Sequence, residues 1–187
     1  MIIIFLGPPF SGKGDQARLL GERLNLPVFS MGALIREARD RGNKKIAEAF
    51  EQYSMRGLHI PIGIKLPLLK EKMDKSKEGF ILDNFPERED GLKTLSSYLS
   101  KNSLSVNRVF FINVPDEEVI RRRKKKERIG RPDDAPEIIK KRLKVQGQER
   151  LPVVNYFRSK GVLVEINGER KENEIHNEIM KILNKNK

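Results

Sequence analysis

The sequence predicts an α/β domain in which a five-stranded parallel sheet is covered by helices on both faces. Short apolar runs alternate along the chain with longer segments whose leucines and isoleucines recur at helical spacing. The chain has 187 residues, 37% hydrophobic and 34% charged, which suits one domain with a buried core and a charged surface. A fold of this kind places its site at the carboxyl ends of the strands.

The first strand and helix form the clearest pair. Residues 1–6 (MIIIFL) are all apolar and rich in isoleucine, as expected of a strand buried on both faces. A glycine-rich turn follows, and residues 16–24 then carry leucines at helical spacing. Further along, we predict a short strand over residues 26–29 and helices over 31–40, 44–55 and 64–73, separated by glycines and prolines.

The second half of the chain repeats the alternation. Residues 79–82 and 106–114 (VNRVFFINV) are predicted strands, and a basic helix covers 116–126. A long helix is predicted from about Asp133 toward Phe157, with acidic residues in its first turn that suit the helix dipole. The last strand is predicted over 162–166 and the last helix over 172–183.

The composition narrows the classes of function. The chain contains no cysteine, which excludes disulfides and cysteine-ligated zinc sites. His59 and His176 lack ligand spacing and are interpreted as surface or packing residues. No apolar run reaches the roughly 20 residues that cross a bilayer, and the apolar start is too short for a signal peptide, so we expect a cytoplasmic protein with no membrane partner. The formal net charge of +12 suits nucleic acid or polyanionic substrates.

A glycine-rich loop lies between the first strand and the first helix. Residues 7–13 (GPPFSGK) fit the first seven positions of G-x-x-x-x-G-K-[ST]. In this pattern backbone N–H groups turn toward phosphate oxygens, the lysine adds charge at the β- and γ-phosphates, and the helix N-terminus adds its dipole. We therefore predict that the loop binds the phosphates of a nucleotide. The next residue is Gly14, where most such loops carry Ser or Thr to hold magnesium.

Further motifs follow in register along nearly the whole chain. Residues 79–86 (GFILDNFP) are similar to G-F-[IL]-L-D-G-F-P, and residues 130–134 (GRPDD), followed by Arg142 and Leu143, are similar to G-R-x-D-D…R-L. Residues 29–32 (FSMG) with Arg36, and residues 55–58 (MRGL), complete the set. Together with GPPFSGKGDQA, where a glycine follows the lysine, these segments resemble the adenylate kinase family.

The resemblance implies a three-layer P-loop NTPase fold in a single kinase domain over residues 1–187. Its core would comprise residues 1–30, 79–120 and 133–187. A monophosphate-binding helical insert would cover about 31–73, and a short lid about 121–132. Longer members of the family insert a larger lid, sometimes with zinc, so the short form agrees with the absence of cysteine.

The resemblance also implies an activity, the transfer of the γ-phosphoryl group of ATP to a nucleoside monophosphate by a monomer. AMP is the expected acceptor (ATP + AMP = 2 ADP), with Mg²⁺ and without zinc. The implied catalytic residues are Lys13, Asp83, Arg131 and Arg142, with Asp83 holding Mg²⁺ through water. The implied ATP-binding residues are Pro9, Phe10, Ser11, Gly12, Lys13, Gly14, Asp15 and Arg121, the last of which would stack on adenine. The implied monophosphate-binding residues are Ser30, Met31, Arg36, Gly57, Leu58, Phe85, Arg131 and Arg142.

Several positions depart from the family's pattern, mostly on the acceptor side. Glu87 stands where an arginine normally meets the acceptor phosphate, Gly91 where a glutamine normally reads adenine, and Asp15 where a threonine normally lies near the donor phosphates. Because losing a charge-assisted hydrogen bond costs about 1.5–3 kcal/mol, the changes at Glu87 and Asp15 are expected to weaken phosphate binding unless something compensates. Arg88 is one candidate replacement for the arginine, and Asp15 is a candidate magnesium ligand. Phe10 and Asn84 also replace glycines.

Two alternative functions remain open from the sequence. The first is a nucleotide-binding relative with little kinase activity, acting as a sensor or partner-binding protein, which the changes on the acceptor side would explain. The second is a nucleic-acid role for the basic run at 121–126 (RRRKKK), although this run lacks interleaved aromatic residues and also fits a solvated helix face. Binding of ATP without a monophosphate would favour the first, and RNA affinity that falls steeply with salt would favour the second.

Overall fold

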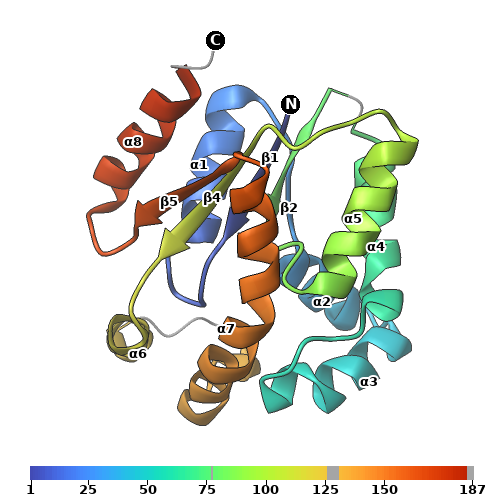
Figure 1. Ribbon diagram of the computed structural model, residues 1–187. Coiled ribbons are helices and arrows are strands. Elements are labelled where there is room, and N and C mark those ends of the chain that lie inside the picture. The colour runs from blue at the N-terminus through green and yellow to red at the C-terminus, as the bar shows by residue number, and fades with distance from the viewer. Residues whose placement is uncertain (77, 126–130, 185–187) are drawn as a thin grey trace.

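Five parallel strands form one sheet in the computed structural model, which describes residues 1–76, 78–125 and 131–184. The strands lie in the order β2-β3-β1-β4-β5, so the chain begins in the middle of the sheet and extends it in both directions (Figure 1). This architecture confirms the predicted α/β class and the five parallel strands. The strands are β1 (Ile2–Leu6), β2 (Val28–Ser30), β3 (Phe80–Asp83), β4 (Arg108–Asn113) and β5 (Leu163–Asn167).

Helices cover both faces of the sheet (Figure 1). Their bounds are α1 (Lys13–Leu24), α2 (Met31–Asp40), α3 (Lys44–Gln52), α4 (Ile62–Asp74), α5 (Glu89–Lys101), α6 (Asp116–Lys125), α7 (Pro136–Ser159) and α8 (Glu172–Asn184). Two short 3-10 turns, η1 (Ser54–Arg56) and η2 (Pro132–Asp134), precede α4 and α7. Within the described ranges, none of these helices has the length and apolarity needed to cross a membrane.

Strand β1 divides the hydrophobic core into two layers. Ile2, Ile4 and Leu6 face the side covered by α2 to α5 and the end of α7, whereas Ile3 and Phe5 face α1 and α8. All five side chains are at most 2% exposed. The all-apolar strand that opens the sequence is therefore the centre of both layers. Burying one such side chain stabilises the fold by about 1.5–3 kcal/mol.

Helix α5 is not among the elements predicted from the sequence. Its buried residues Leu92, Leu95 and Leu99 do recur at helical spacing, but Gly91 and the serines between them weaken the helical signal. A Cβ atom on Gly91 would lie 3.2 Å from the ring of Phe85, so this helix packs closely on the loop that follows β3.

The chain between α6 and α7 differs from the prediction. The long helix begins at Pro136 rather than near Asp133, because proline suits the first helical position and Asp133 and Asp134 form the separate turn η2. Both aspartates are buried and contact the site instead of capping the helix. Residues 126–130 of the expected lid, including Lys126 and Gly130, lie outside the described residues.

Candidate active site

A cleft of about 840 Å³ opens at the carboxyl ends of the strands, where a parallel sheet is expected to bind its ligand. The phosphate loop forms one wall, and the beginnings of α1 and α2 and the segments after β3 and β5 form others. Basic side chains outnumber acidic ones around it, which favours a polyanionic ligand. The basic residues are Lys13, Arg18, Arg36, Arg122, Lys125, Arg131, Arg142 and Arg170, and the acidic residues are Asp15, Asp83, Asp133, Asp134 and Glu172.

The phosphate loop has the backbone geometry that its glycines predict. Gly12 has a φ of 87°, and Lys13 Nζ donates a hydrogen bond of 3.1 Å to the carbonyl of Pro8, which holds the ammonium group over the loop. Phe10, which replaces a glycine of the pattern, also adopts a left-handed φ of 59°. Such a conformation costs a residue with a side chain about 1–2 kcal/mol. The predicted loop residues Pro9 to Asp15 all line the cleft.

The basic helix α6 presents Arg122 to the cleft rather than Arg121. Arg122 donates to the carbonyl of Phe10 at 3.2 Å and to that of Gly168 at 2.7 Å, and so connects the phosphate loop with the end of β5. Arg121 pairs with Glu118 at 2.6 Å, its side chain is 55% exposed, and it does not line the cleft. Adenine stacking by Arg121 stays a prediction, but the neighbouring Arg122, about 100° further round the helix, is the residue that contacts the phosphate loop. Contact with the donor base is therefore a prediction for Arg122 as well.

Two further residues of the basic run also contact or line the site. Arg123 donates to the carbonyl of Asp134 at 2.9 Å, and Lys125 lines the cleft. Several members of the run thus contact this chain's own backbone or face the cleft, which does not favour a separate nucleic-acid surface.

Two buried aspartates orient one of the predicted catalytic arginines. Arg142 Nη1 lies 3.2 Å from Asp133 Oδ2 and 3.6 Å from Asp134 Oδ1, and both aspartates are 6% exposed. Arg36 and Arg131 line the same cleft from other segments. The arrangement collects three guanidinium groups around one space, as the transfer of a charged phosphoryl group requires.

Asp83 has an oxygen available for a metal ion. The residue ends β3 and is 8% exposed, and its Oδ1 is buried without a hydrogen-bond partner among the described residues. Its Oδ2 lies 3.4 Å from where a Cβ atom on Gly14 would be, so the two residues face one another across the loop. A carboxylate with a free oxygen beside a phosphate loop fits the sparse ligand set of a hydrated Mg²⁺.

A second, smaller cavity adjoins the cleft on the side of α2 and α4. It contains Met31, Leu58 and Arg36 of the predicted monophosphate site, while Ser30 lines the main cleft. Two predicted residues, Gly57 and Phe85, do not line either cavity. Phe85 is fully buried beside α5, and the carbonyl of Gly57 accepts a hydrogen bond of 3.2 Å from Gln146. The described residues that line it are Met31, Gly32, Ile35, Arg36, Phe50, Ser54, Leu58, His59, Ile60, Lys65, Asn84, Glu87, Asp133, Arg142 and Gln146.

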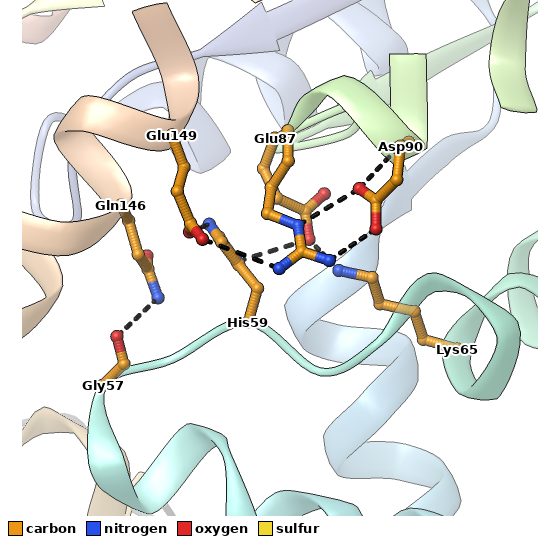
Figure 2. Close-up of polar contacts among 9 residues, drawn as sticks. Gly57, His59, Lys65, Glu87, Asp90, Gln146 and Glu149 are labelled. Carbon is orange, nitrogen blue, oxygen red and sulfur yellow. Dashed lines mark hydrogen bonds and ion pairs between the residues drawn. The ribbon is translucent and has the colours of Figure 1, made fainter. Parts of the chain in front are cut away.

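Glu87 is compensated in this smaller cavity by Lys65 (Figure 2). Lys65 Nζ donates to Glu87 Oε1, and both residues are 3% exposed. Arg88, the candidate replacement for the missing arginine, pairs instead with Asp90 and lies 3.6 Å from Glu149. The positive charge of Lys65 therefore offsets the negative charge of Glu87, which was expected to repel a phosphate. The sequence analysis did not single out Lys65.

The sequence carries a signal for Lys65 that could have been found. It is the single charged residue in the apolar run 60–69 (IPIGIKLPLL), where a charge on a buried helix face needs a partner. His59, interpreted as a surface or packing residue, is 7% exposed and lines the same cavity, with Nδ1 3.4 Å from Glu87 Oε1. Burial, followed by the charge of Lys65, holds the pKa of His59 well below its ordinary value, so the imidazole is neutral at pH 7.

Comparisons with known proteins agree with this geometry. A family model described as adenylate kinase matches residues 5–162. The chain belongs to the adenylate kinase family. Curated adenylate kinases match it along nearly the whole length, so the resemblance stated from the motifs is confirmed.

Three relatives illustrate how far the adenylate kinase likeness extends. An adenylate kinase of Leptospira biflexa is 35% identical over 184 residues, which cover 96% of this chain and 97% of the relative. One of Dehalococcoides mccartyi is 33% identical and covers 89% of this chain and 90% of its own. Adenylate kinase 1 of a Nostoc species is 31% identical with 95% of both chains covered. Neither alternative, the inactive relative or the nucleic-acid binder, is favoured by these matches.

Proposed function

We propose that this member of the adenylate kinase family transfers the γ-phosphoryl group of ATP to AMP, forming two molecules of ADP. One observation carries the proposal. The cleft at the phosphate loop and the smaller cavity share a wall, so a donor in one and an acceptor in the other would meet end to end. The residues that line both are Gly32, Arg36, Asn84, Asp133 and Arg142.

Residues of the main cleft and of the shared wall each have a place in the transfer. The phosphate loop and Lys13 hold the β- and γ-phosphates of ATP, and Arg36 holds the phosphate of AMP. Arg142, oriented by Asp133, and Arg131 neutralise charge on the phosphoryl group as it moves. Because phosphoryl transfer depends chiefly on alignment and charge stabilisation, these residues supply what the reaction needs from the protein.

The family uses ATP with Mg²⁺, and Asp83 is the residue that would hold the ion, through water. When bound, the ion would offset the negative charge of the phosphates. Asp15 also faces the cleft and adds a second carboxylate near the same phosphates. The role of Asp83 is supported by its buried Oδ1, which has no hydrogen-bond partner among the residues that the structure describes.

The proposal is tested with ATP, Mg²⁺ and a panel of monophosphates (AMP, CMP, UMP and GMP), scored by ADP formation. We expect turnover with AMP, and we expect Lys13→Ala to lower kcat/KM for ATP at least about 100-fold because a charge on the transferring phosphates is lost. Lys93→Ala removes an exposed lysine of α5 and should leave turnover unchanged. A folded wild-type chain that is inert toward the whole panel would contradict the proposal.

A further inference from the structure

Lys65 brings a buried positive charge to the wall of the smaller cavity. Its side chain extends from α4 toward Glu87, which lies in the loop before α5 (Figure 2). Removing two charges from water is costly, and apolar residues of similar volume are often equally stable or better in such a place. Stability alone therefore gives little reason for the pair, and its place in the wall of a substrate cavity points to a use for the charges.

The ammonium group of Lys65 has hydrogen-bond donors to spare. It carries three N–H donors, and one of them goes to Glu87 Oε1. Its side chain makes no other hydrogen bond to any residue that the structure describes. A buried ammonium group with unused donors is unfavourable until a ligand accepts from it, and an oxyanion is the strongest such acceptor.

The ammonium group lies among side chains that line the smaller cavity. His59 Nδ1 is 3.4 Å from the same Glu87 oxygen that accepts from Lys65, so three lining side chains converge on one atom. The cavity has a volume of about 60 Å³, which is room for about four to six waters at about 10–15 Å³ each. An anion in a space of this size lies close to every charge in its wall.

Positive charge outweighs negative charge around this cavity. Of the described residues that line it, three carry a positive charge and two a negative charge: Arg36, Lys65 and Arg142 against Glu87 and Asp133. The neutral His59 responds to the same balance. Burial, followed by the charges of Lys65 and of three arginines, Arg142 among them, holds its pKa well below the ordinary value although a carboxylate lies beside it. The cavity therefore favours an anion.

The phosphate of an acceptor belongs where the smaller cavity meets the main cleft, because it receives the phosphoryl group there. Arg36 and Arg142 line both spaces, and Arg36 Nη1 lies 3.2 Å from where a Cβ atom on Gly32 would be, on the shared wall. Asn84 is part of this wall, and Glu87 follows it by three residues, so their Cα atoms are at most about 11 Å apart. The charge pair thus lies close to the junction.

We infer that Lys65 binds the phosphate of the acceptor, with Nζ donating to a phosphate oxygen beside Arg36 and Arg142. Glu87 is a positioning residue in this role, because its Oε1 holds the ammonium group without contacting the phosphate. The inference rests on the proposed function, since the acceptor is a nucleoside monophosphate. The unused donors of Lys65 gain an acceptor, and a third cation adds to the two arginines in balancing the phosphate charge.

The test measures the binding of the two parts of AMP separately, on the full-length chain with its main cleft filled by a non-hydrolysable ATP analogue. Ribose 5-phosphate carries the phosphate without the base, and adenosine carries the base without the phosphate. The variant Lys65→Met/Glu87→Leu leaves no unpaired charge in the core. It should raise the Kd of AMP and of ribose 5-phosphate at least about tenfold, and change that of adenosine by less than about twofold. Calorimetric titration measures all three.

A second variant keeps the lysine and needs no large change in the core. Glu87→Gln retains an oxygen that accepts from Lys65 and removes the negative charge. The Kd of ribose 5-phosphate should fall at least about threefold, because the positive charges around the phosphate are no longer offset by Glu87. An unchanged or larger Kd in Glu87→Gln overturns the inference, whether or not the double variant folds.

A matched control uses the same residue types on the surface. Glu89 and Lys93 pair at 3.0 Å on α5 with side chains 63% and 75% exposed, and Lys93→Met/Glu89→Leu should keep the wild-type affinities. An unchanged affinity for ribose 5-phosphate in the buried double variant, or an equal loss for adenosine, overturns the inference and leaves AMP phosphorylation standing. A wild-type chain that forms no ADP from ATP and AMP overturns the proposed function, and the inference with it.

Discussion

Two residues of the site hold a backbone conformation that the family pattern assigns to glycine. Phe10 and Asn84 both have a φ of 59°, in the left-handed region. Asparagine tolerates this region better than most residues, whereas a bulky side chain such as that of Phe10 is strained there. Both residues line the main cleft, so the conformation is held at the place where the substrates would meet.

The strain at residue 84 leads to a prediction about stability. Asn84→Ala should lower the free energy of unfolding by about 1 kcal/mol, while Asn84→Gly should be neutral or stabilising, because glycine adopts a positive φ without cost. Urea unfolding of the purified variants measures both. Asn177→Ala, an exposed position in α8 with ordinary helical geometry, serves as the control and should not destabilise. Equal stability of the alanine and glycine variants at position 84 would contradict this account.

At the scale of elements, helix α6 determines which arginine contacts the phosphate loop. Successive residues on a helix point about 100° apart, so Arg121 and Arg122 have different surroundings although they are adjacent. Glu118 pairs with both, but only Arg122 also bonds to the phosphate loop and to Gly168. The helix therefore connects the phosphate loop to the end of the last strand of the sheet.

This arrangement predicts unequal effects of two alanine substitutions. Arg122→Ala should weaken ATP binding by about 10- to 100-fold, since it removes a charged donor at the loop, whereas Arg121→Ala should change it by less than about twofold. Calorimetric titration with ATP measures both affinities. If Arg121→Ala proved the more damaging change, the placement of α6 relative to the loop would be wrong.

The sequence predicted most elements because their local signals and their tertiary roles agree. Strand β1 is apolar throughout and central in the sheet, and α2 begins and ends where its periodicity predicts. Helix α5 was missed because its leucines are interleaved with weak helix formers, and its stability comes from packing those leucines into the hydrophobic core. The sequence identified the phosphate loop because that motif is local. It did not identify Lys65, or which face of α6 lies toward the cleft, because both depend on how distant segments pack together.

At the scale of the whole molecule, the buried neutral imidazole of His59 makes the free energy of unfolding depend on pH. His59 lies between the carboxylates of Glu87, at 3.4 Å, and Glu149, at 3.6 Å, but burial and the positive charges of Lys65 and Arg150 lower its pKa. In the unfolded chain the same group takes up a proton near its ordinary pKa of about 6.5. The unfolded state thus binds more protons, and stability falls as the pH drops below that value.

We expect the wild-type free energy of unfolding to fall between pH 6.5 and 5 with a contribution from His59 of up to about 1.4 kcal/mol per pH unit. In His59→Asn this contribution should vanish, so the variant should show a shallower dependence on pH. Urea unfolding at pH 7.5, 6.5, 5.8 and 5.0 measures both profiles. Identical slopes would show that His59 is not held neutral in the folded chain.

The central claim is that the main cleft and the adjoining smaller cavity align ATP with AMP for direct transfer. The most direct measurement follows the label of [γ-³²P]ATP incubated with AMP, Mg²⁺ and the purified chain. We predict that the label appears at the β-position of ADP formed from AMP, with two ADP produced for each ATP consumed. Release of the label as inorganic phosphate, or ATP binding without any labelled ADP, would contradict the claim.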